Sequence, residues 1–306
     1  MRKFVLLCAS VFAMGLLFSA GPAQAQFALW VSPNGNDNNS CYEGAPCLTF
    51  QGAINKGNVA VINCIGSGYY GPFTVTASIT IDCGAGNVGS VVTGGGGSNA
   101  ITINTTSAAT IVLRHLALNG LGTALSGIVT SGFPSGNLIV EDCAVQGFSY
   151  GIFFAPATGR GLLHVTNSQV FGNVWGIDVS PAAGQIASVT LNRVEILANS
   201  TFGLLLEGNV VAGTMRDSVV GANGNSGIYT SANQVFFTVE ESSIVDNIQY
   251  GILAASAGSA IKVAASTIGG NGTGIRPFSG SIISFGDNHV SDNGSDGTFT
   301  STIALK

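Results

Sequence analysis

Two carboxylates and two guanidinium groups in this chain are residue types that act on sugar polymers. Asp217 and Glu241 are one repeat apart, and Arg193 and Arg216 lie close to them in the pattern. Paired carboxylates hydrolyse glycosidic bonds, and an arginine can act as the base of a polysaccharide lyase. However, a neighbouring arginine lowers the pKa of a carboxyl group, whereas a general acid needs a raised pKa. We therefore favour a surface ladder of ion pairs and keep catalysis as the alternative.

Four aromatic residues recur directly before a glycine, where they could stack on sugar rings. They are Tyr150, Trp175, Phe202 and Tyr250. Such a column would bind a glycan, although an aromatic at this place also packs against a turn in ordinary repeats. The residues after the next aliphatic position are expected to point outward and to form a mixed face: Phe153, Asp178, Leu205, Tyr229, Leu253 and Arg276.

These residues recur together because the chain repeats about every 24 residues. A Gly-aliphatic pair begins at Gly127, Gly151, Gly176, Gly203, Gly227, Gly251 and Gly274. An Asn recurs just upstream, at Asn173, Asn199, Asn223, Asn247, Asn271 and Asn293. Apolar residues alternate with polar ones and show no helical spacing. Two columns in register at this period predict a solenoid of short strands, namely a parallel β-helix.

In a β-helix each coil lies about 4.8 Å above the previous one, so equivalent residues stack. We expect the Asn side chains to bond to one another along a turn, and the glycines to permit a bend that a Cβ would strain. Aligning the coils on their interior aliphatics places one polar column along the molecule: Asn63, Asp82, Arg114, Asp142, Asn167, Arg193, Asp217, Glu241, Ala265 and Asp287. Asn192, Arg216 and Glu240 should run beside it.

The first 25 residues have the pattern of a secretory signal peptide. Arg2 and Lys3 precede an apolar run from Phe4 to Phe18, and small residues lead to a cleavage site after Ala25. We expect a secreted or periplasmic protein without a membrane span after cleavage. The whole chain has 10 basic and 15 acidic residues and no cluster of Lys or Arg. This balance argues against nucleic acid as a partner and against electrostatic capture of a polyanion.

The chain resembles the right-handed parallel β-helix proteins of the pectin-lyase-like superfamily, and especially exported bacterial β-helix-repeat proteins. The resemblance rests on the repeats and on a start that reads Trp30-Val31-Ser32-Pro33-Asn34-Gly35-Asn36-Asp37, Cys41, Pro46-Cys47-Leu48-Thr49-Phe50 and Ala53-Ile54. It implies an all-β, single-stranded right-handed β-helix of about ten coils with a short N-terminal capping helix. We expect a signal peptide at 1–25, a cap segment at 26–58, the β-helix at 59–298 and a tail at 299–306.

The resemblance implies that Thr49 is the N-cap of the capping helix and that Phe50, Ala53 and Ile54 cover the first coil. Five cysteines follow the signal peptide, in a compartment where disulfides persist. Cys41 and Cys47 could close a small loop, and Cys64 and Cys83 occupy the same place on successive coils, within disulfide reach. Cys143 is left over. We expect a packed thiol there, because no His or Asn partner can be named.

The catalytic signatures of the resembling enzymes are incomplete in this sequence. Asn104-Thr105-Thr106 breaks the Asn-Thr-Asp motif of polygalacturonase-like members, and their Gly-His-Gly and Arg-x-Lys motifs do not occur. Pectate-lyase-like members need an acidic calcium cluster, which Glu141-Asp142 and Glu240-Glu241 imitate only in part, so we expect no metal or other cofactor. Three hypotheses stay open: a non-catalytic protein that binds a polysaccharide or cell-surface glycan, which we favour; a polysaccharide lyase or glycoside hydrolase; and a structural spacer.

Overall fold

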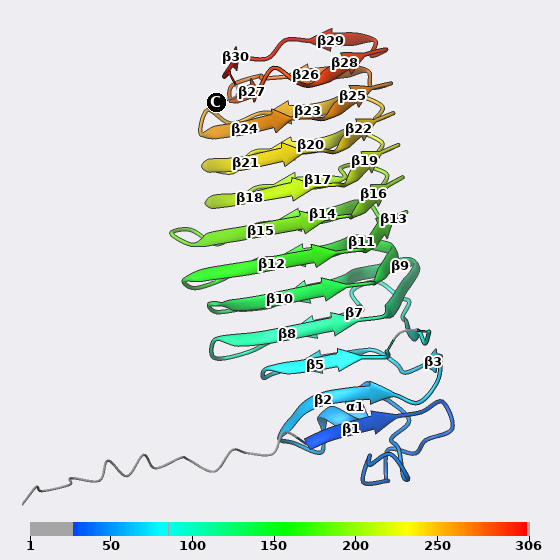
Figure 1. Ribbon diagram of the computed structural model, residues 1–306. Coiled ribbons are helices and arrows are strands. Elements are labelled where there is room, and N and C mark those ends of the chain that lie inside the picture. Colours follow the sequence, from blue (N-terminus) through cyan, green and yellow to red (C-terminus); the bar gives the residue numbers. More distant parts are fainter. Residues whose placement is uncertain (1–26, 85, 305–306) are drawn as a thin grey trace, which may run out of the picture.

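The chain is wound into a stack of coils that runs from the N-terminal to the C-terminal part of the sequence (Figure 1). The computed structural model describes residues 27–84 and 86–304, so the expected signal peptide at 1–25 lies outside the described residues. The described coils form a parallel β-solenoid of about ten turns, and this confirms the predicted right-handed β-helix. Every pairing between its named strands is parallel, because each strand pairs with its equivalent in the next coil.

The longest sheet holds 12 strands, one from each pass of the chain along the same side. In spatial order they are β1 (Phe27–Val31), β2 (Val59–Cys64), β5 (Ile79–Asp82), β8 (Ala109–Arg114), β10 (Gly136–Glu141), β12 (Arg160–Thr166), β15 (Ile186–Asn192), β18 (Val210–Arg216), β21 (Gln234–Glu240), β24 (Ser259–Ala264), β27 (Ser281–Ser284) and β30 (Ser301–Thr302). We call this the first sheet.

Two further runs of paired strands complete each coil and share the long strands β9 (Leu116–Thr130) and β11 (Ala144–Phe154). The second sheet adds β3 (Gly68–Tyr69), β6 (Gly89–Val92), β13 (Gln169–Phe171), β16 (Glu195–Leu197), β19 (Val219–Gly221), β22 (Ser243–Val245), β25 (Thr267–Gly269) and β28 (His289–Ser291). The third sheet adds β4 (Phe73–Val75), β7 (Asn99–Ile103), β14 (Trp175–Val179), β17 (Leu204–Leu206), β20 (Ser226–Thr230), β23 (Tyr250–Ala254), β26 (Thr273–Arg276) and β29 (Ser295–Gly297).

The core is a set of stacked aliphatic columns, as the repeat predicted. Ile177 pairs with Leu204, which pairs with Ile228, and none of the three is exposed. Burial of each such side chain stabilises the fold by about 1.5 to 3 kcal/mol. A one-residue shift would turn a whole strand inside out, so these columns fix the register of every coil.

The Asn residues form the expected ladder inside a turn. Asn223 is fully buried, and its Nδ2 donates to Oδ1 of Asn247 at 2.9 Å and to the carbonyl oxygen of Ile196 at 3.3 Å. In return, Oδ1 of Asn223 accepts from the backbone N–H and the side-chain amide of Asn199. Each amide thus satisfies backbone groups of a neighbouring coil that would otherwise be buried without a partner.

The glycines before the aliphatic residues are needed for a reason other than the one we expected. None of the seven has a positive φ, so they do not make a bend that other residues would avoid. Instead they lie against the Asn ladder. A Cβ on Gly227 would be 2.7 Å from Nδ2 of Asn247 and 2.8 Å from the carbonyl oxygen of Gly251. From Gly151 to Gly274 the amides leave no room for a side chain, whereas at Gly127 the side chain of Val145 and the carbonyl oxygen of Gly151 occupy that space.

The N-terminal end is covered by the predicted short helix, α1 (Phe50–Ile54). The hydroxyl oxygen of Thr49 accepts from the N–H of Gly52 at 2.9 Å, which makes Thr49 the N-cap. Phe50 is fully buried and packs on Tyr70 and Phe73, with ring centroids 5.0 and 5.1 Å away. This helix shields the apolar interior that the first coil would otherwise expose.

Two disulfides connect the cysteines that the sequence paired. Cys41 is bonded to Cys47, and Cys64 is bonded to Cys83 with a Cα separation of 4.4 Å, as expected for residues on adjacent coils. Within the described part of the chain, no helix is long and apolar enough to cross a membrane.

Candidate functional site

The predicted polar column is wrong by one residue at its N-terminal end. Asp82 pairs with Arg114, as expected, but Arg114 pairs with Glu141 and not with Asp142. The residue stacked on Asp142 is His115. The reason is the backbone conformation. The residue directly after each of the strands β8, β10, β12, β15, β18, β21 and β24 has a positive φ, and the series is His115, Asp142, Asn167, Arg193, Asp217, Glu241 and Ala265. Arg114 lies one residue after the buried Leu113, whereas Asp142 lies two residues after Val140, the residue that pairs with Leu113. The predicted column therefore combined two different positions of the turn.

Of the four catalytic candidates, Arg193, Asp217 and Glu241 lie in this column, and Arg216 lies directly before Asp217 at the end of β18. The Arg216 guanidinium donates to both carboxylate oxygens of Glu241 at 2.8 Å, and its Nε is 3.7 Å from Asp217. The side chains of Arg216, Asp217 and Glu241 are 54%, 44% and 47% exposed. The bond to Glu241 raises the pKa of Arg216, so this guanidinium is held in its charged form. It is therefore unsuited to act as a base.

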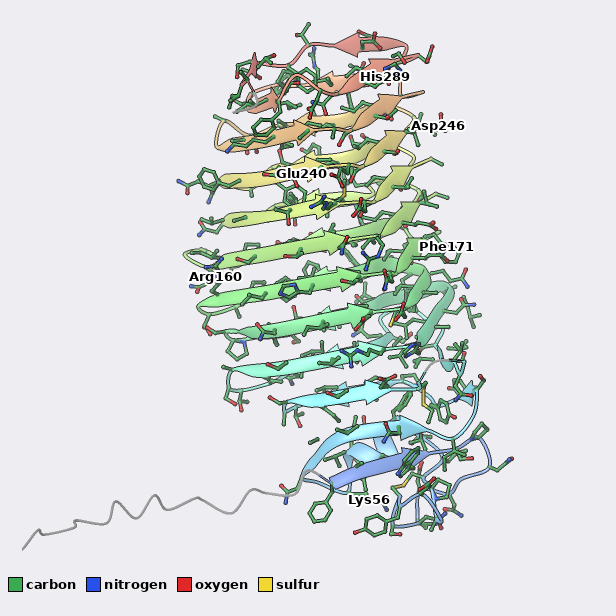
Figure 2. The ribbon with its side chains drawn as sticks, in the orientation of Figure 1. Lys56, Arg160, Phe171, Glu240, Asp246 and His289 are labelled. Atoms are coloured by element: carbon green, nitrogen blue, oxygen red, sulfur yellow. A yellow bond between two sulfur atoms is a disulfide. The ribbon has the colours of Figure 1, made fainter. Side chains whose placement is uncertain are left out.

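Arg193 takes no part in these ion pairs. Its Nε donates to Oδ1 of Asn167 at 2.6 Å, while Glu195 accepts a hydrogen bond from Gln169 at 2.8 Å. Figure 2 shows Glu240 at the end of β21, on the same side of the stack as this ladder. The structure thus brings Arg216, Asp217 and Glu241 together and leaves Arg193 outside the cluster.

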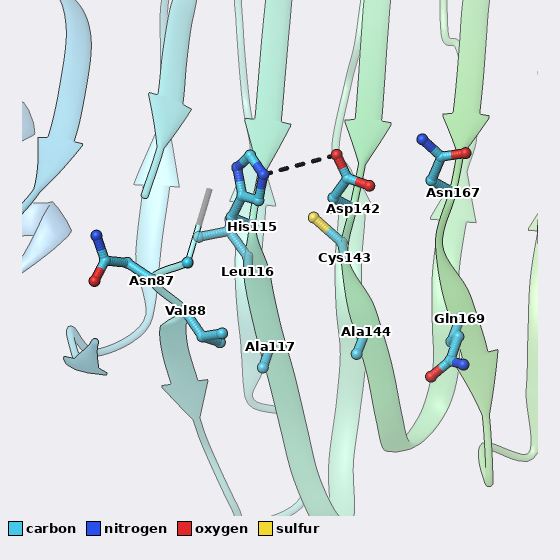
Figure 3. A pocket seen from close by; sticks show the side chains of 11 residues that line it. Asn87, Val88, His115, Leu116, Ala117, Asp142, Cys143, Ala144, Asn167 and Gln169 are labelled. Atoms are coloured by element: carbon cyan, nitrogen blue, oxygen red, sulfur yellow. Dashed lines mark ion pairs between the residues drawn. The ribbon is translucent and has the colours of Figure 1, made fainter. Parts of the chain in front are cut away.

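An open cavity of about 560 Å³ lies on the same turn, nearer the N-terminus. It crosses four coils, where the first sheet turns into the second (Figure 3). Its polar lining comes from Asn87, His115, Asp142, Asn167 and Gln169, and its apolar floor from Val88, Leu116, Ala117 and Ala144, with Gly86 and Cys143 completing it. This cavity has the size and the mixed lining of a small-molecule site. We call it the His115 groove.

His115 is held in the groove by carboxylates on either side. Its Nδ1 is 2.8 Å from Oδ1 of Asp82, and its Nε2 is 3.7 Å from Oδ2 of Asp142. Asp82 also accepts from the N–H of Gly84 at 2.7 Å, which fixes the carboxylate. An imidazole oriented through one nitrogen leaves the other for a ligand. The groove can therefore offer both a hydrogen-bonding ring and a carboxylate to the same hydroxyl group.

Cys143 borders the groove but is not free to react. The side chain is 4% exposed, and its Sγ lies 3.2 Å from the carbonyl oxygen of Glu141. Burial raises the pKa of this thiol to about 12, so the sulfur keeps its proton at neutral pH. Among residues 27–84 and 86–304, no group of three or more His, Cys, Asp or Glu side chains is placed to hold a metal ion.

The groove continues along the second sheet. Gln169 also lines a second hollow of about 200 Å³, which is bordered by Phe171, Glu195, Leu197 and Ala198. Figure 2 shows Phe171 at the edge of the stack, away from Arg160 on the first sheet. The two hollows give a surface several coils long in which polar and apolar patches follow each other.

The predicted aromatic column is only partly stacked. Tyr150 and Trp175 lie face to face, with ring centroids 4.6 Å apart and planes at 20°. Phe202 does not continue this stack; it pairs with Tyr229 of the next coil at 4.7 Å and 13°. Tyr250 is in register with Ser226 and Thr273, which carry no ring. Within the column only Tyr150 and Trp175 stack on each other, because the partner of Phe202 lies outside the column and Tyr250 has no ring in register.

Asp178 and Leu205 do not point freely into solvent, contrary to expectation. Both face away from the core, between the inward residues Ile177 and Val179 or Leu204 and Leu206, yet they are only 2% and 6% exposed. The side chains around them form a cover on the outer face of the third sheet, including Phe153, which contacts Tyr150 with ring centroids 5.2 Å apart. The residues in register with them are large, since Phe153 pairs with Asp178 and Tyr229 pairs with Leu205, and such side chains reduce the exposure of their neighbours.

Sequence reasoning missed the place of His115 in the polar column, and it placed Asp178 on the outer face without predicting its burial. The pair Arg114-His115 ends its strand in the same way as Glu141-Asp142 does one coil later. Aligning these two pairs would have placed His115 beside Asp142. Asp178 carried a signal of another kind. It is the one carboxylate in an outer column otherwise filled mainly by Phe, Leu and Tyr.

Comparison with known proteins agrees with this architecture. A family model described as "Right handed beta helix region" matches residues 175–303. The crystal structure of pectate lyase Pel9A is similar with a TM-score of 0.60 and 14% identity, over 91% of this chain and 78% of that one. The A-module of the mannuronan C-5 epimerase AlgE4 from Azotobacter vinelandii gives a TM-score of 0.39 and 13% identity, over 81% and 91%.

A search of curated proteins finds no significant match. At 14% identity, the likeness to the pectate lyase concerns the fold alone. Together with the stacked coils and the family model, it establishes that this chain has the right-handed parallel β-helix, pectin-lyase-like fold.

Proposed function

We propose that this protein binds a glycan in the His115 groove, outside the cytoplasm. The observation that carries the proposal is the open cavity of about 560 Å³, in which amide, imidazole and carboxylate side chains surround an apolar floor. A pyranose presents hydroxyl groups at its rim and C–H groups on its faces. Planar polar side chains bond to hydroxyl groups, and an apolar floor accepts the face of the ring.

The length of the surface favours a polymer over a single sugar. Gln169 joins the cavity to the hollow at Phe171 and Leu197, so that a ligand lying along the stack meets side chains from successive coils. Adjacent coils are spaced by about 4.8 Å, which is close to the length of one sugar unit. Each unit of an extended glycan would therefore meet an equivalent set of positions.

The charge of the groove favours an uncharged glycan. Asp82 and Asp142 flank His115, and the whole chain has a formal net charge of −5. The similar solved structure is named as a pectate lyase, and pectate is a polyanion. Two carboxylates at the centre of the site would repel such a ligand. The stacked pair Tyr150 and Trp175 is a less suitable sugar platform, because each ring already covers one face of the other.

Export is part of the proposal. The sequence pattern at 1–25 is that of a signal peptide, and the disulfides Cys41–Cys47 and Cys64–Cys83 belong to an oxidising compartment.

A glycan array followed by titration calorimetry tests the proposal. We expect neutral polysaccharide fragments to bind, and His115→Ala and Gln169→Ala to weaken binding about tenfold each, the usual scale for one hydrogen-bonding group. His289→Ala is the matched control, because His289 is exposed on β28, far along the stack. Absence of binding to every glycan, or equal affinity in the His115 and His289 variants, would overturn the proposal.

A second function is supported by the Asp82–His115 pair. A carboxylate at 2.8 Å from Nδ1 orients the ring so that Nε2 can exchange a proton with a bound ligand. This arrangement would suit a polysaccharide lyase or glycoside hydrolase. Screens for new reducing ends and for unsaturated uronates decide the matter: turnover that His115→Ala abolishes would establish catalysis, and bound glycan recovered intact would establish binding alone. A spacer would show neither binding nor turnover.

A further inference from the structure

Asp178 is the buried charged group that the fold does not account for. It lies on β14 between the core residues Ile177 and Val179, with its side chain on the outer face. In the register of the third sheet its neighbours are Phe153 on one coil and Leu205 on the other. The side chain is 2% exposed, and Oδ1 has no hydrogen-bond partner. A buried carboxylate without a partner is rare in native structures and calls for an explanation.

The surroundings of Asp178 are aromatic. Tyr150 stacks on Trp175 at 4.6 Å and contacts Phe153 at 5.2 Å, while Phe202 stacks on Tyr229 at 4.7 Å on the next coils. Asp178 thus lies on the same strand as Trp175, between Phe153 on one neighbouring coil and Leu205 on the other. Aromatic faces carry negative potential and attract cations, most strongly in the case of Trp.

A second carboxylate lies beside the first. The backbone N–H of Glu207 donates to the carbonyl oxygen of Val179 at 2.9 Å, which places Glu207 next to Asp178 across the coil boundary. Burial raises the pKa of Asp178 to about 8, and the charge of Glu207 raises it as well. The pKa of Tyr150 is also raised, by burial and then by Asp178 and Glu207. These are the titratable groups that face Asp178.

Within residues 27–84 and 86–304, no cationic side chain forms an ion pair with either of these carboxylates. The next cation in the outer column is Arg276, which is separated from Asp178 by the coils of Leu205, Tyr229 and Leu253.

We propose that this aromatic face, formed by Tyr150, Phe153, Trp175, Asp178 and Glu207, is a binding site for an ammonium group. The cation would pair with the unpartnered carboxylate of Asp178, while the rings provide cation–π contacts. The aromatic side chains of this face, Tyr150, Phe153 and Trp175, are themselves only partly buried, so rotation of their rings would admit a ligand without unfolding a strand. The ligand chemistry is an alkylammonium group, carried either by an amino sugar or by a quaternary amine.

This site is separate from the His115 groove, which none of its five residues line. If no ammonium compound binds here, the proposed glycan site is unaffected. If no glycan binds in the His115 groove, the proposed ammonium site is equally unaffected.

Tryptophan fluorescence provides the test, because the chain has two Trp and one of them is Trp175. In a Trp30→Phe background the signal reports on this site alone. One arm compares choline with dimethylbutanol, its uncharged carbon isostere. The other compares a glucosamine trimer with an N-acetylglucosamine trimer, in which the amines are neutral.

We expect saturable changes with at least one cationic probe and none with its neutral counterpart; the arm that responds identifies the source of the ammonium group. Asp178→Asn should weaken binding by about tenfold or more, and Glu207→Gln by about threefold, since its charge acts at longer range. Asp217→Asn is the matched control on the exposed ladder and should not change the affinity.

Three results would overturn the proposal: no response to either cation, equal binding of a cation and its neutral counterpart, or unchanged affinity in Asp178→Asn. If Asp178→Asn folds differently, as judged by near-UV circular dichroism, the Glu207→Gln variant decides. In that case an affinity equal to that of the wild type contradicts the site.

Discussion

The exposed ladder at Arg216 and the aromatic face at Asp178 handle charge in opposite ways. Arg216 donates to both oxygens of Glu241 at 2.8 Å, and both side chains are about half exposed. Asp178 is 2% exposed and its Oδ1 has no partner. Both regions are built by the same repeat, one at the turn after the first sheet and the other on the outer face of the third.

The difference distinguishes charged groups that the fold itself explains from charged groups that require a ligand to explain them. An exposed ion pair contributes little to the free energy of unfolding, because both groups are well solvated with or without each other. Its presence therefore requires no functional explanation. A buried, unpaired carboxylate is costly to ionise, so the fold would be more stable without it. The His115 groove is intermediate between these two cases, because its carboxylates lie beside the His115 imidazole and are still accessible to a ligand. Four predictions probe this contrast.

The largest effect should come from Asp178→Asn at alkaline pH. The folded-state pKa of Asp178 is about 8 against an ordinary 3.8, so the folded protein holds this proton more tightly than the unfolded chain. The contribution of Asp178 to stability is then full below about pH 4 and is lost as the pH rises through about pH 8. Asn does not ionise. The variant should exceed the wild type in unfolding free energy by on the order of 5 kcal/mol above about pH 9, and by little below about pH 4.

Denaturant unfolding at several pH values measures this difference. The control is Asp217→Asn, whose curve should follow that of the wild type. Parallel pH profiles for wild type and Asp178→Asn would mean that Asp178 has a partner in solution. Asp178 would then not differ from the paired charges of the Arg216 ladder.

The next effect concerns Cys143, a second buried ionisable group without a charged partner. Its pKa of about 12, against an ordinary 9.0, lowers the thiolate fraction near neutral pH by about a thousandfold. We expect iodoacetamide to alkylate the native protein at least about a hundredfold more slowly than the denatured, unreduced chain. Mass spectrometry of the labelled protein gives both rates. Similar rates would show that the groove opens to expose the sulfur.

A smaller effect is expected when the charge that orients His115 is removed. Asp82→Asn keeps the size of the side chain but replaces the charge-assisted bond to Nδ1, so glycan affinity should fall about tenfold. Calorimetry with the glycan identified on the array measures the loss. Glu240→Gln on the exposed turn is the control. Unchanged affinity in Asp82→Asn would separate His115 from ligand binding.

The smallest effect belongs to the exposed ladder. Arg216→Ala removes the bidentate bond to Glu241, yet both partners are solvated before and after the change. We expect the midpoint of denaturant unfolding to stay within experimental error of the wild type. A clear loss of stability would show that the ladder fixes coil register, and would weaken the distinction drawn above.

The repeat made most of the fold predictable. Asn223 and Asn247, recognised as equivalent by spacing, are hydrogen-bonded at 2.9 Å, and Thr49 and the paired cysteines take the places expected of them. This works because stacking converts sequence period into contact. The site was less predictable. The predicted column counted one residue after Leu113 but two after Val140, which set Arg114 beside Asp142 and hid His115. The glycine column was assigned a backbone role, although it serves the packing of the Asn amides.

The sequence by itself determined which residues stack, because a period near 24 and alternating strands leave one winding that buries every aliphatic column. Only the tertiary structure decided which of the outward-facing side chains are exposed and which are buried by their neighbours. Side-chain direction between coils depends on ring size and on the neighbours above and below, which no single repeat contains. That is why Arg216 and Asp178 were both expected on the surface, although Arg216 is about half exposed and Asp178 is buried on the outer face of the third sheet.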